Sequence, residues 1–277
     1  MSIRHAAGLL AAVGLLLSGC TSSRDAAAPT TDPVSSAPNL TTGPPRCLPD
    51  VGDPELIDVN VPDGPRLSAL VAGSGPRGLV LVHGASGEGR CTWERQIPTL
   101  VELGFTILAF DHACVADSDC PSGGEVDLVA DIGAGVAELR ARGAGRIGVI
   151  GASLGTAETV VSAGAPDFDV DAVIALSPAL PTTDVRPPDA PEPRNAAAAA
   201  TLADVPVLYV TAEQDRVSQV EDAQALFDAT MDERSELIVI PGFAHAQLLV
   251  YPPGAGPDTP PSGDVFDRVV AFLDRYV

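Results

Sequence analysis

The order of apolar and polar positions along the chain predicts strands and helices in alternation. Continuous apolar runs, typical of strands buried on both faces, occur at residues 79–83, 105–110, 147–150, 173–176, 207–210 and 237–240. Segments with helical spacing of their apolar positions occur at 93–103, 125–142, 154–163, 218–231 and 262–276. Strands that alternate with such helices form β-α-β units, so the pattern predicts an α/β domain with a mostly parallel central sheet flanked by helices.

Two further strands are predicted before this alternation begins. Residues 56–61 and 67–71 are short and apolar-rich, and the Pro-Asp-Gly-Pro sequence between them is typical of a turn. We expect them to pair as an antiparallel hairpin, which brings the sheet to about eight strands. Because open parallel sheets place their binding sites at the carboxyl ends of the strands, the residues directly after each strand are the candidates for chemistry.

The first twenty residues have the features of an export signal. Arg4 precedes an apolar run of twelve residues, 6–17, which is too short for a bilayer-spanning helix of about 20 residues. Residues 17–20 read Leu-Ser-Gly-Cys and resemble the lipobox of bacterial lipoproteins. This resemblance implies that Cys20 is acylated, becomes the new N-terminus, and anchors an exported protein to the outer face of a bacterial cell membrane. An ordinary signal peptide that ends near a cysteine is the alternative.

A tether is predicted after this signal. Residues 20–46 are rich in Pro, Ser and Thr and lack the apolar content that a folded segment buries. The predicted organisation is therefore a lipoprotein signal peptide at 1–19, an acylated cysteine and tether at 20–46, and one folded domain at 47–277. A domain of that length buries a sizeable core on its own.

The charge of the chain limits its partners. Its 277 residues include 37 acidic and 16 basic side chains, every base is arginine, and the formal net charge is −21. This acidity excludes DNA, RNA and anionic lipid headgroups as electrostatic partners, because phosphate binding needs clustered Lys and Arg. Membrane association is therefore expected to rest on acyl chains. The acidity also predicts a site that disfavours strongly anionic substrates, unless an arginine such as Arg90 or Arg216 offsets it.

The folded domain contains four cysteines: Cys47, Cys91, Cys114 and Cys120. An even number in an exported chain predicts two disulfides, for which three connectivities exist. A local bridge between Cys114 and Cys120 and a bridge between Cys91 and Cys114, which follow successive strands, are both open. A zinc site is the weaker alternative because no C-x-x-C pair is present, and the acidic run at 167–171 lacks the glycine and glutamate of a calcium loop. No metal is expected.

Residues typical of nucleophilic catalysis follow three of the predicted strands. Strand 147–150 leads into Gly-Ala-Ser-Leu-Gly, which places Ser153 in a G-x-S-x-G motif between a strand and a helix. The next two motifs, Ala-Glu-Gln-Asp and Pro-Gly-Phe-Ala-His, end in Asp215 and His245. A serine, an acid and a histidine in this order resemble the triad of the α/β-hydrolase family, and the resemblance covers about residues 56–277.

The resemblance implies a role for each of these side chains. Ser153 is the expected nucleophile, His245 takes its proton and returns it to the leaving group, and Asp215 orients the imidazole and stabilises its charged form. The alternatives are a surface-loop position for His245, a helix N-cap near Ser218 for Asp215, and Glu213 as the acid.

A His-Gly pair also resembles a motif of this family. His83 and Gly84 end the strand predicted at 79–83. The resemblance implies that the backbone N–H groups of Ala85 and Leu154 form an oxyanion hole. His83 itself is expected to be structural and to hold the loop by hydrogen bonds.

The chain departs from the family in two segments. Residues 111–118 read D-H-A-C-V-A-D-S where the family often has D-x-R-G-x-G-x-S, so a disulfide is expected to shape this loop. Asp117 and Asp119 are expected to be solvated. Residues 177–206, where the family often inserts a lid, number only about 30 and predict a small or absent lid.

The resemblance implies a serine hydrolase that cleaves a small-molecule ester through an acyl-enzyme, without metal or organic cofactor. An amide or peptide bond is the nearest alternative substrate, because the same triad serves both reactions. The competing class is a surface-anchored binding protein that retains the fold and a relic triad. Neither the substrate nor the oligomeric state follows from the sequence.

Overall fold

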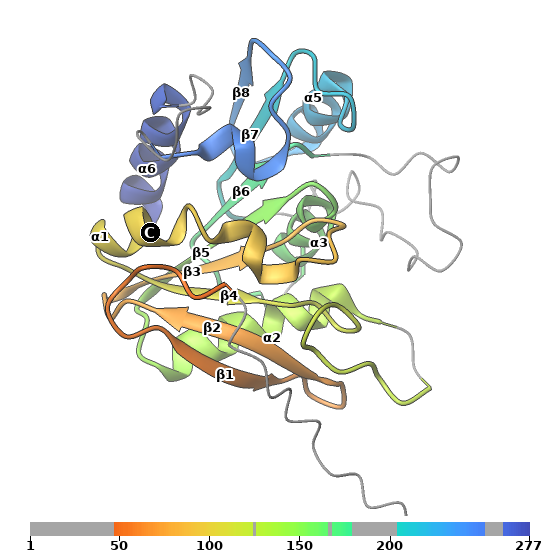
Figure 1. Ribbon diagram of the computed structural model, residues 1–277. Helices are drawn as coiled ribbons and strands as arrows, with labels where there is room; N and C mark the ends of the chain where they lie inside the picture. Colours follow the sequence, from red (N-terminus) through yellow and green to blue (C-terminus); the bar gives the residue numbers. More distant parts are fainter. Residues whose placement is uncertain (1–46, 124–125, 166–167, 179–203, 253–262) are drawn as a thin grey trace, which may run out of the picture. The chain divides into compact units, whose positions relative to one another are not determined.

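The computed structural model describes residues 47–123, 126–165, 168–178, 204–252 and 263–277 (Figure 1). The predicted signal peptide, lipobox and tether, and most of the segment 177–206, lie outside these residues. The described residues belong to one compact unit, Pro45–Val277. Every helix in these ranges falls short of the length and apolarity needed to cross a bilayer.

In the described part of the chain, eight strands form one sheet in the order β1-β2-β4-β3-β5-β6-β7-β8. They are β1 (Glu55–Asn60), β2 (Arg66–Ala72), β3 (Arg77–Val82), β4 (Phe105–Phe110), β5 (Arg146–Ala152), β6 (Ala172–Leu176), β7 (Val207–Ala212) and β8 (Glu236–Ile240). β1 and β2 form the predicted antiparallel hairpin, β2 also pairs antiparallel with β4, and all other pairings are parallel. The predicted strands are therefore confirmed, with ends that differ by one or two residues.

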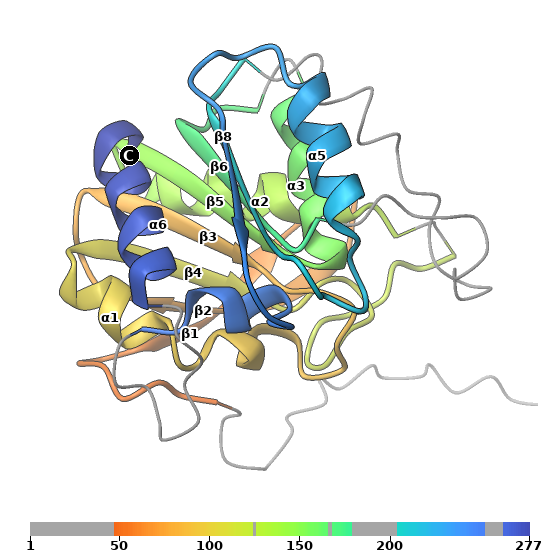
Figure 2. The ribbon, with the colours of Figure 1, turned by 90° about the horizontal axis from the view of Figure 1, so that it is seen from above.

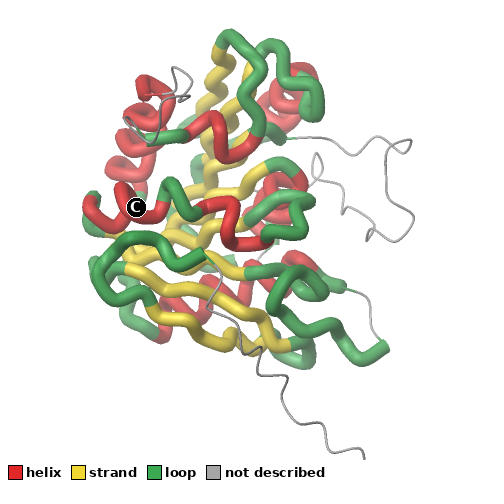
Figure 3. Tube along the Cα trace, viewed as in Figure 1, coloured by secondary structure: helices red, strands yellow, loops and turns green. Residues whose placement is uncertain are grey.

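Helices cover both faces of the sheet (Figures 1 and 2). They are α1 (Ile97–Glu102), α2 (Leu128–Ala141), α3 (Leu154–Ala163), α5 (Val220–Ala229) and α6 (Gly263–Tyr276), with 3-10 helices η1 (Gly89–Trp93) and η2 (Ala246–Val250). α1 and α6 pack on one face and α2, α3 and α5 on the other, so the buried apolar residues form two cores. In Figure 3 the strands lie as one layer between helices.

The helix predicted at 93–103 is divided into two pieces. η1 ends at Trp93, whose side chain is fully buried, and α1 begins only at Ile97. Pro98 lacks a backbone N–H, which a helix tolerates only in its first turn, so α1 starts beside it. The prediction of one continuous helix was therefore wrong.

The structure selects one of the three disulfide connectivities. Cys47 is bonded to Cys91 and Cys114 to Cys120, with Cα–Cα distances of 5.3 and 4.4 Å. The local bridge and the disulfide-closed loop after β4 are confirmed, whereas a Cys91–Cys114 bridge is wrong. The Cys47–Cys91 bond fastens the start of the folded domain to η1, in the loop that follows β3.

We predict that Gly155→Ala destabilises the protein and that Gly133→Ala does not. A Cβ at Gly155 would lie 2.6 Å from the carbonyl oxygen of His83 and 3.0 Å from that of Val82. These are backbone atoms, which cannot move away without displacing the strand. Overpacking of this kind costs about 1–3 kcal/mol. A Cβ at Gly133, inside α2, would have nothing within 4 Å. Alanine there should raise the free energy of unfolding by about 0.5–1 kcal/mol.

Chemical denaturation of the two variants and the wild type measures both effects. Equal free energies of unfolding for wild type and Gly155→Ala would contradict the close approach of α3 to the end of β3.

Candidate active site

Ser153 lies at a tight turn between β5 and α3. Its backbone has φ 53° and ψ −120°, a left-handed φ that is uncommon for a residue with a side chain. Small neighbours permit the turn: a Cβ at Gly151 would lie 2.5 Å from both the carbonyl oxygen of Gly155 and the hydroxyl of Thr159. The G-x-S-x-G sequence therefore exposes a serine hydroxyl at the carboxyl edge of the sheet.

The structure brings Ser153, His245 and Asp215 together from the ends of three strands. The imidazole Nε2 of His245 is 3.0 Å from Ser153 Oγ, and its Nδ1 is 2.7 Å from Asp215 Oδ2. A carboxylate only accepts hydrogen bonds, so Nδ1 carries the proton and Nε2 is free to accept from the serine. The Asp215 side chain is fully buried, whereas that of His245 is 25% exposed. A surface-loop position unconnected to the other two side chains is therefore wrong for His245.

Asp215 also organises its own loop. Its Oδ1 accepts hydrogen bonds from the backbone N–H groups of Val217 and Ser218, at 2.9 and 3.2 Å. The N-cap of α5, however, is Gln219, so the alternative of Asp215 as the helix cap is wrong, although the carboxylate does close the turn before the helix. Glu213, the rival acid, is exposed to solvent.

Ser177 belongs to this arrangement and was missed in the sequence. Its hydroxyl, fully buried, donates to Asp215 Oδ2 and accepts from the backbone N–H of Ala246, both at 2.8 Å. It directly follows β6 and has φ 52°. Ser218 Oγ in turn donates to the Ser177 carbonyl oxygen at 2.6 Å. Its place after a strand, at the same edge as the other three, was the signal that could have identified it.

The loop after β3 lies against the serine turn. A Cβ at Gly84 would be 2.9 Å from Ser153 Cβ, so only glycine permits this approach. Ala85 follows in this loop, and Leu154 is the first residue of α3, where the helix itself offers its N–H no acceptor. Both backbone groups therefore belong to the two segments that meet at Ser153. Their role as oxyanion donors stays a prediction.

His83 holds this loop in place. Its Nε2 accepts a hydrogen bond from the backbone N–H of His112 at 3.0 Å, so the ring proton is on Nδ1, which donates to the Gly84 carbonyl at 2.7 Å. Burial, together with the nearby His112, lowers the pKa of His83 to about 3 and keeps the ring neutral. The prediction of a structural His83 is confirmed.

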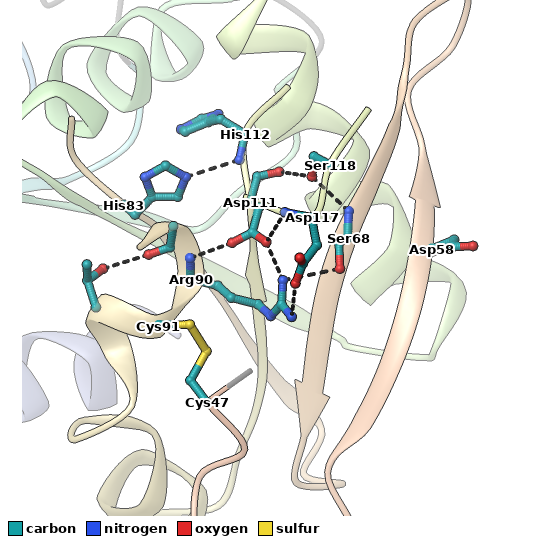
Figure 4. A network of polar contacts seen from close by, with 12 residues as sticks. Cys47, Asp58, Ser68, His83, Arg90, Cys91, Asp111, His112, Asp117 and Ser118 are labelled. Carbon is teal, nitrogen blue, oxygen red and sulfur yellow. Dashed lines mark hydrogen bonds and ion pairs between the residues drawn. A yellow bond between two sulfur atoms is a disulfide. The ribbon is translucent and has the colours of Figure 1, made fainter. Parts of the chain in front are cut away.

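A buried arginine ties the same loop to the loop after β4 (Figure 4). Arg90, 3% exposed, pairs with the carboxylate of Asp111, and its backbone N–H also donates to Asp111 at 2.7 Å. Arg90 reaches Asp117 at 3.2 Å as well. Asp117 is therefore half-buried in an ion-pair network, and the prediction that it is simply solvated was wrong. Burial raises the pKa of Asp111, and the hydrogen bonds from Arg90 oppose that shift.

A small cavity opens beside the triad. Its volume is about 280 Å³, and its lining residues are Asp215, Arg216, Val217, Phe243 and His245. This is just below the usual range of ligand pockets, roughly 300–1,000 Å³, and suits a small group. Val217 and Phe243 are 64% and 63% exposed, so two apolar residues lie at the mouth of the cavity beside Arg216.

Asp169 and Asp171, in the acidic run at 167–171, contribute to surface ion pairs. Arg140 lies 3.0 Å from a carboxylate oxygen of Asp169 and 3.6 Å from one of Asp171. Within the described ranges, no three His, Cys, Asp or Glu side chains lie close enough to hold a metal ion.

Solved structures with the same architecture are known. No protein-family model and no curated protein matches the chain by sequence. The structure is similar to that of an esterase from Pyrococcus furiosus, with TM-score 0.65 and 20% identity, covering 84% of this chain and 97% of that one. It is also similar to a monoacylglycerol lipase from Paleococcus ferrophilus, with TM-score 0.60 and 17% identity, covering 75% and 98%. The chain has the α/β-hydrolase fold.

We predict that Ser177→Ala slows the reaction of Ser153 with a fluorophosphonate. The substitution leaves the buried N–H of Ala246 without its acceptor, which costs about 1–3 kcal/mol, and frees both Asp215 and the His245 loop to shift. A displacement of about 1 Å lowers reactivity roughly 100-fold, so we expect a 10- to 100-fold slower second-order rate.

Ser162→Ala is the matched control. Ser162 is equally buried, but its hydroxyl donates to the Glu158 carbonyl inside α3 and touches none of the three side chains. Equal labelling rates for the Ser177 and Ser162 variants would show that Ser177 plays no part in positioning the site.

Proposed function

We propose that this protein is a serine hydrolase that cleaves carboxylic esters through an acyl-enzyme. The observation that carries the proposal is the hydrogen-bonded series from Ser153 Oγ through His245 to Asp215, with distances of 3.0 and 2.7 Å. These distances lie within the range for proton transfer between a nucleophile and its base. The open cavity beside His245 leaves room for a small group of the substrate.

The proposed reaction has two stages. His245 Nε2 accepts the proton of Ser153 as Oγ attacks the ester carbonyl carbon, and the resulting imidazolium is stabilised by Asp215. The backbone N–H groups of Ala85 and Leu154 stabilise the negative oxygen of the tetrahedral intermediate. His245 then gives its proton to the departing alcohol. In the second stage a water molecule, deprotonated by His245, attacks the acyl-enzyme and releases the carboxylic acid and Ser153.

Ester cleavage is preferred to amide cleavage on two grounds. Proteins that share this fold include an esterase and a monoacylglycerol lipase, which supports ester chemistry by analogy. The surface of the cavity is also mostly apolar in area, whereas recognition of a peptide backbone draws on a row of hydrogen-bonding groups. Hydrolysis of aminoacyl anilides in preference to esters would favour the amide alternative.

We also propose that the domain is exported and carried on a lipid anchor at Cys20. Removal of residues 1–19 takes away one positive charge, that of Arg4, and shifts the formal net charge from −21 to −22. Anionic headgroups repel such a surface, so acyl chains on Cys20 must supply the binding to the membrane. The two disulfides of the domain agree with an oxidising compartment outside the cytoplasm.

For the reaction, Ser153→Ala and Asp215→Asn are expected to lower kcat/KM on short-chain 4-nitrophenyl esters by about 10⁴-fold. The second variant keeps the shape of the acid but loses the charge that fixes the imidazole tautomer. Glu213→Gln is the matched control, because Glu213 lies two residues away on the same loop and is exposed. The proposal would be contradicted if Asp215→Asn hydrolysed esters as fast as the wild type. It would also be contradicted if the folded wild type neither hydrolysed esters nor became labelled at Ser153. That second result would favour a binding protein with a relic triad.

For the anchor, the mature N-terminus isolated from membranes should be a diacylglyceryl-modified Cys20, as measured by mass spectrometry. Cys20→Ala is expected to abolish this modification and to lower the lipid-anchored membrane fraction, because the residue that carries the acyl chains is removed. Arg24→Ala in the tether is the control and should leave the protein in the membrane fraction. An unmodified Cys20 in membrane extracts would rule out the lipobox.

A further inference from the structure

Arg216 places a positive charge at the mouth of the cavity beside the triad. It directly follows Asp215 in the sequence, and its side chain lines the cavity together with those of Val217, Phe243 and His245. Its guanidinium carbon lies 5.6 Å from the centre of the Phe243 ring, within the range of a cation–π contact. A group that enters the cavity therefore meets one cation and two apolar side chains.

Most arginines of the described ranges already have a carboxylate as partner: Arg66, Arg77, Arg90, Arg140, Arg142, Arg234 and Arg275. Arg216 differs, because the partner that the structure gives it among the described residues is the Phe243 ring. Among the described residues, Arg146 and Arg268 also have no ion pair, but of these three arginines only Arg216 lines the cavity. Its charge is available to a ligand.

The other arginine considered for this role, Arg90, is not available. Its side chain is 3% exposed and is held between Asp111 and Asp117. It contributes to the loops around the site but presents no charge to a substrate. Of these two arginines, only Arg216 can therefore offset the negative charge of the domain at the cavity.

We propose that Arg216 and Phe243 form a subsite for a carboxylate on the substrate, so that the preferred esters combine a short apolar chain with one negative charge. The proposal rests on the proposed ester hydrolysis and names its substrate class. The planar guanidinium matches a carboxylate in two parallel hydrogen bonds, and the ring of Phe243 supports it from one side. The acidic domain repels a doubly charged phosphate more strongly than a singly charged carboxylate, which is why the carboxylate is the favoured ligand.

The test compares two esters of equal chain length and equal leaving group, mono-4-nitrophenyl adipate and 4-nitrophenyl hexanoate. Their kcat/KM ratio, anionic over neutral, is measured for the wild type and for Arg216→Gln. Loss of one charge-assisted pair at a partly exposed site should lower this ratio by about tenfold, through KM of the adipate ester. Arg216→Glu should lower it further, and Arg216→Lys should retain part of it. The intrinsic reactivity of the two esters cancels when ratios are compared between variants.

Arg146→Gln is the matched control. Arg146 is an exposed arginine at the first residue of β5, the end of the strand opposite Ser153, and its removal changes the net charge by the same amount. The control should leave the ratio at the wild-type value. A similar fall in both variants would mean that the effect comes from total charge, and it would overturn the subsite.

Two further measurements test the subsite. Raising the salt concentration from 0.01 to about 0.5 M should bring the wild-type ratio closer to that of Arg216→Gln, because salt screens the attraction to Arg216, whereas repulsion by the acidic domain acts on both proteins. Adipamate, a carboxylate without an ester, should inhibit hexanoate hydrolysis more strongly than methyl phosphate does. Stronger inhibition by methyl phosphate would overturn the choice of carboxylate.

The possible failures are distinguishable. If neither ester is hydrolysed and Ser153 is not labelled by a fluorophosphonate, the proposed function is wrong and the subsite falls with it. If both esters are hydrolysed and the ratio is the same in the wild type and Arg216→Gln, ester hydrolysis stands and the subsite alone is wrong.

Discussion

The site depends on how closely β5 and α3 approach each other at Ser153. A Cβ at Gly151 would lie 2.5 Å from the carbonyl oxygen of Gly155, and a Cβ at Gly155 would lie 2.6 Å from that of His83. The first glycine permits the left-handed turn that exposes the serine hydroxyl, and the second lets the end of β3 approach the same point. The position of the nucleophile and that of the adjoining loop are therefore fixed by one set of backbone contacts.

Burial of Asp215 places a second constraint on the arrangement. A buried carboxylate costs several kcal/mol unless its oxygens are hydrogen-bonded. Here Oδ1 accepts from Val217 and Ser218, and Oδ2 accepts from Ser177 and His245. These donors come from the segments that follow β6, β7 and β8, so the hydrogen bonds to the carboxylate also hold the ends of these three strands together. The Ser177 hydroxyl also accepts a hydrogen bond from the backbone N–H of Ala246, which connects the loop of His245 to the same group.

The sequence was sufficient for the features that depend on local pattern. Apolar runs gave the strands, and the motifs after them gave Ser153, Asp215 and His245, because parallel strands bring such residues to one edge. It was insufficient where the outcome depends on which distant segments meet. Nothing in the sequence pairs Ser177 with Asp215, chooses Cys47 as the partner of Cys91, or buries Asp117 against Arg90. The interruption between η1 and α1 has a local cause, Pro98. The helical spacing of apolar residues that begins at Trp93 nevertheless predicted one continuous helix.

Arg90 and Arg216 illustrate that the role of a charged side chain depends on the groups it contacts, which the net charge of the chain does not reveal. Both arginines lie in segments that follow strands of the sheet, and the sequence alone does not distinguish their roles. Arg90 forms ion pairs with Asp111 and Asp117, so its charge joins two loops of the protein and is not available to a substrate. Arg216 stands next to a buried carboxylate, yet Asp215 already has four donors and needs no further cation. The charge of Arg216 is therefore not needed to satisfy Asp215, and it is available to a group that enters the cavity.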